Sequence, residues 1–375
     1  MSGWQEVRLG DICEFAYGKS LPAKSRTGQG YPVYGSNGVV GFHDQSLTSG
    51  ETIVVGRKGS FGEVQYSESP CWPIDTTYYI TEDQTDSCLP WLAKILPQLR
   101  LTELNRAAAI PGLNREDAYR QRLFLPPLEE QKRIAKILDA ADALRAKRRE
   151  SLAQLDALLQ STFLDLFGDP DSNGWEWSVV EDVAEKRKGA IRTGPFGSQL
   201  LHSEFVDSGV PVLGIDNVVS NEFREGRPRF ITADKYERLK RYTVHPGDVL
   251  ITIMGTCGRC AIVPDGLGVA INTKHLCCIS LNKELCLPEF MHAYFLLHPT
   301  ARRYLEDNAK GAIMSGLNMG IIKALPIPLP PIDLQDKFAK IVQYSKQQKA
   351  RLLEHNEQLT YFFASLQQRA FSGEL

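Results

Sequence analysis

One segment of this 375-residue chain occurs twice, and the duplication restricts the folds that the chain can adopt. Residues 125–137 (LPPLEEQKRIAKI) return as residues 329–341 (LPPIDLQDKFAKI), with seven of 13 positions identical at an offset of 204. The offset is only 171 between Trp4 and Trp175, so the second copy holds 33 additional residues before its own LPP segment. Because loops tolerate insertions and paired helices do not, the globular parts are expected to differ and the segments after LPP to match.

Each copy ends in a segment that is predicted to form one long helix. After Pro127 the chain contains no glycine or proline as far as Leu166, and apolar residues recur with heptad spacing. A proline in the first turn, followed by acidic residues such as Glu129, is typical of a helix N-terminus. Helices over 127–166 and 331–370 would each be roughly 60 Å long. The predicted contact positions are Ile134, Ile137, Ala141, Leu144, Arg148, Ser151, Leu155, Leu158 and Thr162 in the first helix, widened by Leu138, Leu152 and Leu159, and Phe338, Ile341, Ser345, Gln348, Leu352, His355, Leu359, Phe362 and Leu366 in the second.

The two helices are expected to pair with each other, because each contact stripe is polar in places where the other is apolar. The first helix leads from the first globular part to the second, so a paired second helix must run back antiparallel to it. The predicted fold class is α+β, with two mixed α/β globular domains joined by a long antiparallel two-helix coiled coil in a pseudo-two-fold, circular repeat. Phe371 should then lie near Trp4, and the repeat makes Ala143 and Gln347 equivalent midpoints of the helices.

Short β-rich runs that end in glycine or other turn residues dominate the globular parts. Their composition predicts strands over residues 51–55, 76–80, 248–253 and 275–281. Two longer stretches, residues 92–106 and 290–307, are predicted to be helices.

Composition excludes several classes of protein. The length predicts two or three domains, each large enough to bury a core, and 43% hydrophobic with 23% charged residues is ordinary for a soluble protein. The first residues show no basic region followed by an apolar run, and no stretch approaches the ~20 apolar residues of a membrane span. The eight cysteines have no disulfide spacing, so a cytoplasmic protein without membrane contact is expected. The net charge of −2 excludes a uniformly basic chain but not a basic face.

Several motifs, in a fixed order, give the chain a resemblance to a known family. They are the two LPP helix starts with Gln131 and Gln335, and residues 32–38 (PVYGSNG), 56–62 (GRKGSFG), 192–200 (RTGPFGSQL) and 367–375 (QQRAFSGEL). Together with the duplication, they make the whole chain resemble the specificity subunit of a type I restriction–modification system. The chain is compact for that family and its first unit is the shorter, which predicts a small first half-site or one read with fewer contacts.

The resemblance implies a non-catalytic subunit that reads a bipartite, asymmetric site in double-stranded DNA. It implies target-recognition domains at 1–126 and 171–330, a central helical spacer at 127–170 and a C-terminal helical spacer at 331–375. The helices would set the spacing and bind two modification (methyltransferase) subunits, and restriction/translocase subunits would complete the nuclease form. These partners would bind S-adenosylmethionine, and ATP and Mg in the restriction form, whereas this chain would bind no cofactor and no metal.

Candidate DNA-binding residues lie in glycine-bounded turns of the first unit. Glycines let the backbone approach phosphates, an arginine can donate two hydrogen bonds to guanine, and a lysine adds positive charge. The alternative interpretation is a solvated hairpin tip at residues 56–60 and a purely structural turn at residues 34–37. The candidates are Tyr34, Ser36, Asn37, Arg57, Lys58 and Ser60.

In the second unit the candidates belong mainly to basic clusters, which release counterions on meeting phosphates. The turn at residues 255–259 matches that at 56–60 and keeps one arginine, while Lys274 stands in a weaker polar stretch. A charged cluster is otherwise an ordinary solvated face. The candidates are Lys188, Arg192, Ser198, Gln199, Arg224, Arg227, Arg229, Arg259 and Lys274.

Alternatives from other classes remain open at this point. The pair Cys257 and Cys260 suggests zinc, but no second pair stands at matching spacing, so buried apolar cysteines are favoured. Both Pro-Pro pairs follow leucine, so the Asn/Asp-Pro-Pro-Tyr motif of amino methyltransferases is missing, as is a P-loop. A stand-alone enzyme acting on DNA, or a coiled-coil adaptor between proteins that does not bind DNA, is the alternative function.

Overall fold

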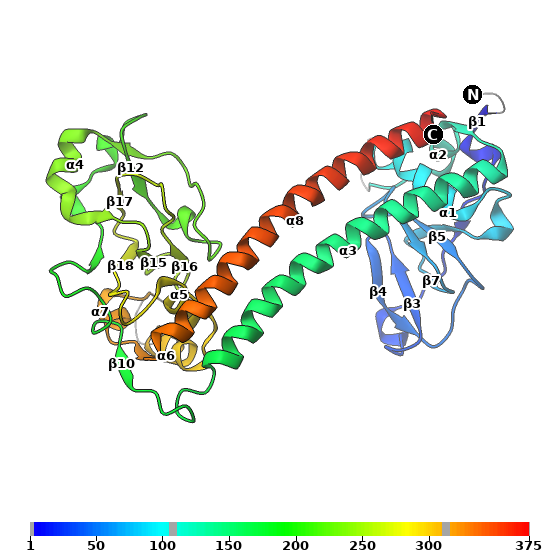
Figure 1. Cartoon of the computed structure of the whole chain (residues 1–375). Helices are drawn as coiled ribbons and strands as arrows, with labels where there is room; N and C mark the ends of the chain where they lie inside the picture. Colours follow the sequence, from blue (N-terminus) through cyan, green and yellow to red (C-terminus); the bar gives the residue numbers. More distant parts are fainter. Residues whose placement is uncertain (1–3, 105–110, 310–315, 375) are drawn as a thin grey trace. The chain divides into compact units, whose positions relative to one another are not determined.

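The computed structural model describes residues 4–104, 111–309 and 316–374 (Figure 1). The chain divides into two compact units: unit 1 comprises Met1–Glu150 with Glu354–Leu375, and unit 2 comprises Ser151–Leu353. Each unit combines small sheets with short helices and with one part of each long helix, which confirms the predicted α+β class.

Unit 1 contains two main sheets and a two-stranded ribbon. The four-stranded sheet has the order β2-β8-β5-β6 and is antiparallel throughout, whereas in the sheet β4-β3-β7 the pair β3 and β7 is parallel. The ribbon pairs β1 with β9, the strand that leads into the first long helix. The strands are β1 (Gln5–Arg8), β2 (Ala16–Tyr17), β3 (Tyr31–Gly35), β4 (Gly38–His43), β5 (Thr52–Gly56), β6 (Val64–Ser67), β7 (Trp72–Pro73), β8 (Thr77–Ile80) and β9 (Arg122–Leu125).

Unit 2 repeats this topology. The four-stranded antiparallel sheet β11-β18-β15-β16 corresponds to β2-β8-β5-β6, and the parallel pair β12 and β17 corresponds to β3 and β7. Much of the extra length falls between β12 and β15, where α4 (Ala233–Leu239) and β14 are inserted. The strands are β10 (Trp177–Val179), β11 (Ile191–Thr193), β12 (Val210–Leu213), β13 (Phe230–Ile231), β14 (Thr243–Val244), β15 (Val249–Thr252), β16 (Cys260–Ile262), β17 (Ala270–Asn272), β18 (Leu276–Ile279) and β19 (Pro326–Pro328).

The four predicted strands are confirmed as β5, β8, β15 and β18, and all residues of β5, β15 and β18 are buried.

Of the two predicted helices, the first is shorter than expected. It begins as α1 (Leu89–Ile95) and gives way to short 3-10 turns up to Glu103, with Arg100 in a left-handed conformation (φ 48°); Arg106 lies outside the described residues. The second is split into α5 (Pro288–Leu297) and α6 (Pro299–Ala309), because a proline disfavours helical geometry in the residue before it, here His298.

The long helices are confirmed as α3 (Leu128–Phe167) and α8 (Ile332–Ser372), the two long ribbons in Figure 1. The predicted contact stripe is wrong in one of its two heptad positions. Leu144 and Leu158 are each 56% exposed and Phe362 is 55% exposed. In that half of the stripe, the buried or half-buried residues come one position later than predicted. They are Leu138, Arg145, Leu152 and Leu159 in α3, and Val342, Lys349, Asn356, Phe363 and Ala370 in α8.

Within each unit the two helices pair with opposite ends together. In unit 1 the start of α3 and the end of α8 share one core, and the Arg145 guanidinium lies 4.5 Å from the Phe363 ring centre. In unit 2 the end of α3 and the start of α8 share another, and Lys349 lies 3.0 Å from Asp156. The helix segments are therefore antiparallel in both units. Trp4 and Phe371 pack on the same core, as the repeat predicted.

A buried glutamine fastens each long helix to the short helix of its own unit. The Gln131 side chain accepts a hydrogen bond from the Cys88 amide before α1 (2.8 Å) and donates one to the Pro126 carbonyl (2.8 Å). Gln335 repeats this arrangement with the Leu287 amide before α5 and the Pro330 carbonyl. These contacts give the glutamine of each LPP motif a structural role.

We expect Gln131→Leu to lower the free energy of unfolding of unit 1 by about 1–3 kcal/mol, because it leaves a half-buried amide and a buried carbonyl without their hydrogen-bond partner. Hydrogen exchange read by mass spectrometry would locate the loss in residues 88–95 and in the start of α3. Gln160→Leu, at an exposed position of α3, is the matched control and should change stability by less than about 0.5 kcal/mol. Equal protection in both variants would contradict this role for Gln131.

Candidate nucleic-acid interface

Three segments that are distant in the sequence of unit 1 meet at one end of its sheets. The Ser36 hydroxyl donates to the Thr76 carbonyl (2.7 Å), and the backbone amides of Arg57 and Lys58 donate to the same oxygen (2.9 and 3.1 Å). The amide of Ile74 donates to the Tyr34 carbonyl (2.9 Å). The structure thus brings together the turn after β3, the turn after β5 and the segment before β8.

The predicted side chains at this junction differ in exposure. Asn37, Lys58 and Ser60 are exposed, while Tyr34, Ser36 and Arg57 are half-buried. The Arg57 guanidinium donates to the Asp75 carbonyl (2.6 Å) and lies 5.3 Å from the centre of the Tyr17 ring. An anchored guanidinium beside an exposed lysine can offer donors and positive charge to a nucleic acid.

The equivalent turn of unit 2 has the same backbone and different side chains. Gly59 and Gly255 both adopt positive φ (75° and 73°), and the hydrogen bond of Phe61 to Gly59 recurs between Cys257 and Gly255. The amide of Gly62 bonds to Gly56 as that of Gly258 bonds to Thr252. These matches give an offset of 196.

At this offset Arg57 and Lys58 correspond to Ile253 and Met254, and Arg259 corresponds to Glu63. The glycine pattern had matched Arg259 with Arg57. The hydrogen bonds of the two turns show that Arg259 is not the counterpart of Arg57. It is nevertheless exposed at the same turn, one residue after Gly258.

A second group of predicted residues meets around the loop after β12. Burial alone would raise the pKa of Asp216, but hydrogen bonds from the Arg229 side chain and the Arg227 amide outweigh it and lower that pKa. The amide of Thr273 donates to the Leu213 carbonyl at the end of β12 (2.8 Å). The next residue, the half-buried Lys274, therefore lies beside the loop after β12. The side chains of Arg224 and Arg227 remain exposed.

Arg192 does not fit its predicted role. Its side chain is 7% exposed, and its Nη2 lies 2.7 Å from a carboxylate oxygen of Asp248, itself 4% exposed. Its Nη1 donates to the Ser280 hydroxyl (3.0 Å). The prediction of a DNA contact is wrong for this residue, because its guanidinium is committed to the interior of unit 2.

Lys188, Ser198 and Gln199 are exposed in the stretches around β11. The Gln199 side chain accepts a hydrogen bond from the Tyr242 hydroxyl (2.7 Å). In the part of the chain that the structure describes, no hydrogen bond or ion pair joins these three side chains to the loop after β12.

Four of the five cysteines of unit 2 are buried core residues, and Cys257 is half-buried beside the same core. Burial raises the pKa of Cys277 to about 12 and also raises the pKa values of Cys260, Cys278 and Cys286. Outside residues 1–3, 105–110, 310–315 and 375, no group of three or more His, Cys, Asp or Glu side chains is placed to hold a metal ion. The described helices likewise include none that is long and apolar enough to cross a membrane.

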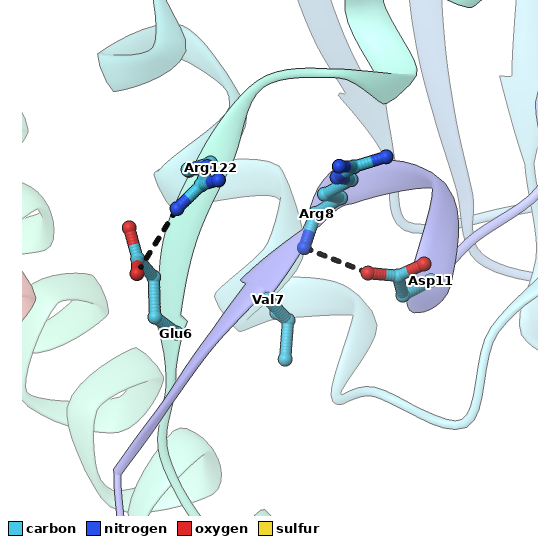
Figure 2. Close-up of a pocket in the computed structure, with 5 residues that line it drawn as sticks. All are labelled: Glu6, Val7, Arg8, Asp11 and Arg122. Atoms are coloured by element: carbon cyan, nitrogen blue, oxygen red, sulfur yellow. Dashed lines mark hydrogen bonds and ion pairs between the residues drawn. The ribbon is translucent and has the colours of Figure 1, made fainter.

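A shallow pocket of unit 1 lies on the β1–β9 ribbon (Figure 2). Figure 2 shows Arg122 turned toward Glu6, at 3.3 Å, and the amide of Arg8 bonded to Asp11 at 2.9 Å. Because these charged and polar groups pair within the ribbon, the pocket is explained by local structure.

Two residues that sequence reasoning did not select lie beside Arg57. Tyr17 is 54% exposed, and the Arg115 guanidinium lies 5.5 Å from its ring centre. Residues 17, 57 and 115 come together only through strand pairing and the loop before α2 (Arg115–Tyr119). No local motif signals this proximity.

Comparison with known proteins identifies the family. A sequence profile described as the type I restriction modification DNA specificity domain matches residues 1–155 and 172–361. The specificity subunit of type I restriction enzyme EcoBI from Escherichia coli is 23% identical over 68% of this chain. A putative specificity subunit from Haemophilus influenzae is 21% identical over 89% of this chain and 85% of its own length. The chain spans 58% of the length of the EcoBI subunit and 35% of that of the EcoprrI subunit from the same species.

Solved structures agree with the fold. The crystal structure of the S subunit from M. genitalium aligns with a TM-score of 0.63 at 15% identity, covering 98% of this chain and 96% of that one. A structure described as the basis of complex assembly and conformational transition of the type I R-M system aligns with a TM-score of 0.60 at 16% identity, covering 100% of this chain and 99% of that one. Since the two profile matches cover both units and most of the sequence, the chain belongs to the family of type I restriction modification DNA specificity domains.

Proposed function

We propose that this chain is the DNA-reading subunit of a type I restriction–modification complex, in which each unit reads one half of a bipartite, asymmetric site. One observation carries the proposal: the two units share sheet order and turn geometry but have different residues at equivalent turn positions. Arg57 and Lys58 in unit 1 stand where unit 2 has Ile253 and Met254. A fold kept twice with unlike side chains suits the reading of two unlike sequences.

The DNA-contacting residues follow from position and exposure. Exposed basic residues supply phosphate contacts, and anchored arginines and amides supply base contacts. In unit 1 the proposed contacts are Tyr34, Ser36, Asn37, Arg57, Lys58 and Ser60. In unit 2 they are Lys188, Ser198, Gln199, Arg224, Arg227, Arg229, Arg259 and Lys274.

The helices are proposed to set the distance between the half-sites and to bind two modification subunits. Each unit leaves large apolar side chains exposed on its helix segments, a feature of surfaces that bind proteins. They include Leu144, Tyr361 and Phe362 in unit 1, and Leu158, Ile341 and Tyr344 in unit 2. The functional division is then 1–126 and 171–330 for DNA, with 127–170 and 331–375 as spacers.

The chemistry is proposed to belong to the partners. Modification subunits with S-adenosylmethionine would methylate adenine, and restriction/translocase subunits with ATP and Mg would cleave DNA. This chain would supply specificity and scaffold only.

DNA binding by the complex of this chain with modification subunits tests the proposal. Affinity for a duplex that carries the recognised site should fall steeply with salt, with a slope of about −0.9 for each phosphate neutralised. Loss of all salt-dependent DNA binding would favour the protein adaptor. Methylation or cleavage of DNA by the purified chain alone would favour the stand-alone enzyme.

If each unit reads its own half-site, single substitutions should act on one half only. We expect Arg57→Ala to weaken discrimination in the first half-site by about 1–3 kcal/mol and to leave the second unchanged. Arg229→Ala removes the anchored arginine of unit 2 and is the matched change there, which should spare the first half-site. Binding to libraries randomised in one half at a time measures both effects, and equal loss in both halves would contradict modular reading.

A further inference from the structure

Tyr17, Arg57 and Arg115 form a compact cluster on unit 1. The guanidinium carbons of Arg57 and Arg115 lie 5.3 and 5.5 Å from the Tyr17 ring centre, within reach of cation–π attraction. Tyr78 lies below Tyr17 at 5.2 Å, and the Arg115 guanidinium also lies 5.7 Å from the Tyr119 ring. Aromatic packing thus holds two positive side chains around one exposed ring.

Both guanidinium groups keep unused hydrogen-bond donors. In the described residues, the only hydrogen bond of the Arg57 side chain is the one to the Asp75 carbonyl, and Arg115 makes neither a side-chain hydrogen bond nor an ion pair. Elsewhere in unit 1, Arg120 and Arg122 lie 3.4 and 3.3 Å from Asp117 and Glu6. The cluster therefore offers positive charge and donors without an acidic partner of its own.

The fold does not require this cluster, because unit 2 keeps the backbone without it. Tyr17 pairs with Tyr78 as Thr193 pairs with Cys277, so Thr193 is the counterpart of Tyr17. Each of these two residues is followed by a glycine, Gly18 or Gly194, that packs tightly against a neighbouring backbone segment. A Cβ added at Gly18 would lie 2.1 Å from the Ile74 carbonyl oxygen, and one added at Gly194 would lie 2.0 Å from that of Asn272.

The other two positions have equally clear counterparts. Arg57 corresponds to Ile253 through the matching turns. Asn114 and Asn318 each cap the next short helix with their side chain, which makes Met319 the counterpart of Arg115. Unit 2 thus replaces a Tyr–Arg–Arg cluster by Thr, Ile and Met, so the cluster belongs to what distinguishes unit 1.

The donors of the cluster define the base that it fits. A guanidinium has five N–H donors and no acceptor. In the major groove guanine presents two adjacent acceptors, N7 and O6, whereas adenine presents an acceptor beside a donor. A pair of guanidinium groups without a nearby carboxylate therefore matches guanine.

We propose that Arg57 and Arg115 read guanine through its major-groove edge in the half-site of unit 1, with Tyr17 as the residue that positions both guanidinium groups. This inference rests on the proposed function and adds to it a base identity and two further residues. The first half-site then contains at least one guanine on which binding depends. Lys58, exposed at the same turn, supplies a phosphate contact beside it.

The test uses the complex of the full chain with modification subunits and a duplex that carries the recognised bipartite site. Each guanine of the first half-site is replaced in turn by 7-deazaguanine, which lacks the N7 acceptor. We expect one replacement or more to weaken binding by about 5-fold or more, because it removes one of the two acceptors of a bidentate contact that is worth about 5- to 150-fold as a whole. The same replacement should have little effect on a chain with Tyr17→Thr, Arg57→Ile and Arg115→Met, the residues that unit 2 accepts at these positions.

Single variants separate reading from positioning. Arg115→Met alone should lower sensitivity to 7-deazaguanine in the first half-site and leave the second unchanged. Tyr17→Phe keeps the ring and should keep the sensitivity, whereas Tyr17→Thr should lose it. Arg122→Met removes an equal charge outside the cluster and serves as the control, with no change expected.

The outcomes distinguish this inference from the proposed function. A wild-type complex that binds no bipartite site would overturn the proposed function itself. A wild-type complex that binds its site but tolerates 7-deazaguanine throughout the first half would overturn only the guanine inference. The guanine inference would also be overturned if Arg115→Met weakened binding to all sequences equally and reduced the slope of log affinity against log salt by about one. That pattern marks a phosphate contact.

Discussion

A chain with one additional heptad in each long helix is expected to recognise both original half-sites across a longer gap. Seven helical residues add about 10 Å, which corresponds to at most about three base-pair steps of 3.4 Å. A heptad preserves the face that each helix presents to its partner, so the pairing contacts are retained. The unextended site should lose about 10³-fold or more in affinity, because a complex that engages a single half-site approaches its non-specific affinity.

The contacts of the two helices decide where the insertions belong. Arg145 contacts Phe363 in unit 1, and Asp156 contacts Lys349 in unit 2. Insertions at Ala143 and Gln347, the midpoints that the repeat suggests, fall outside these two contacts and would shift one helix against the other. Insertions after Glu150 and after Leu353 fall between them and lengthen both helices together.

Binding to a library of gap lengths measures the outcome. A heptad inserted into α3 alone is the control, and we expect it to disrupt helix pairing and weaken binding to sites of every gap length. A doubly extended chain that keeps the original gap, or that recognises altered half-sites, would contradict the role of the helices as a spacer.

Asp248→Ala is expected to destabilise unit 2 by about 3–5 kcal/mol. The substitution leaves the Arg192 guanidinium, 7% exposed, without its carboxylate partner, and an uncompensated buried charge is strongly destabilising. Replacement of both residues, as Arg192→Met with Asp248→Leu, should recover most of that stability because no buried charge remains.

Denaturant unfolding followed by hydrogen exchange in unit 2 measures these effects. Glu181→Ala breaks the exposed pair with Lys323 and is the matched control, expected to cost less than about 1 kcal/mol. If Asp248→Ala were as mild as Glu181→Ala, the structural assignment of Arg192 would be wrong and its original assignment to DNA would regain support.

The sequence predicts the features of this fold that leave a periodic or duplicated pattern. Both long helices, four strands and the repeat itself follow from local composition and spacing. The sequence does not show which leucines of the broad apolar stripe on α3 face inward, because Leu138 and Leu144 are both leucines on that stripe. Only packing in the core of unit 1 decides that Leu138 is buried and Leu144 exposed.

The candidate site was predicted only in part, for a related reason. The turn that carries Arg57 has a glycine signature and Arg227 stands in a basic cluster, so both are visible in the sequence. The sequence does not show that Arg192 is buried, because the Asp248 that pairs with it lies 56 residues away. Arg115 joins the cluster through the fold of residues 111–115 onto the β5–β6 turn, a contact that no local motif encodes.

Sequencing of methylated adenine in a host that expresses the modification subunits, with and without this chain, tests the central claim most directly. The account predicts that the chain adds one motif made of two unlike half-sites separated by a gap of fixed length. A continuous motif, two identical halves, or no chain-dependent methylation would contradict the claim that two unlike units read DNA at a set separation.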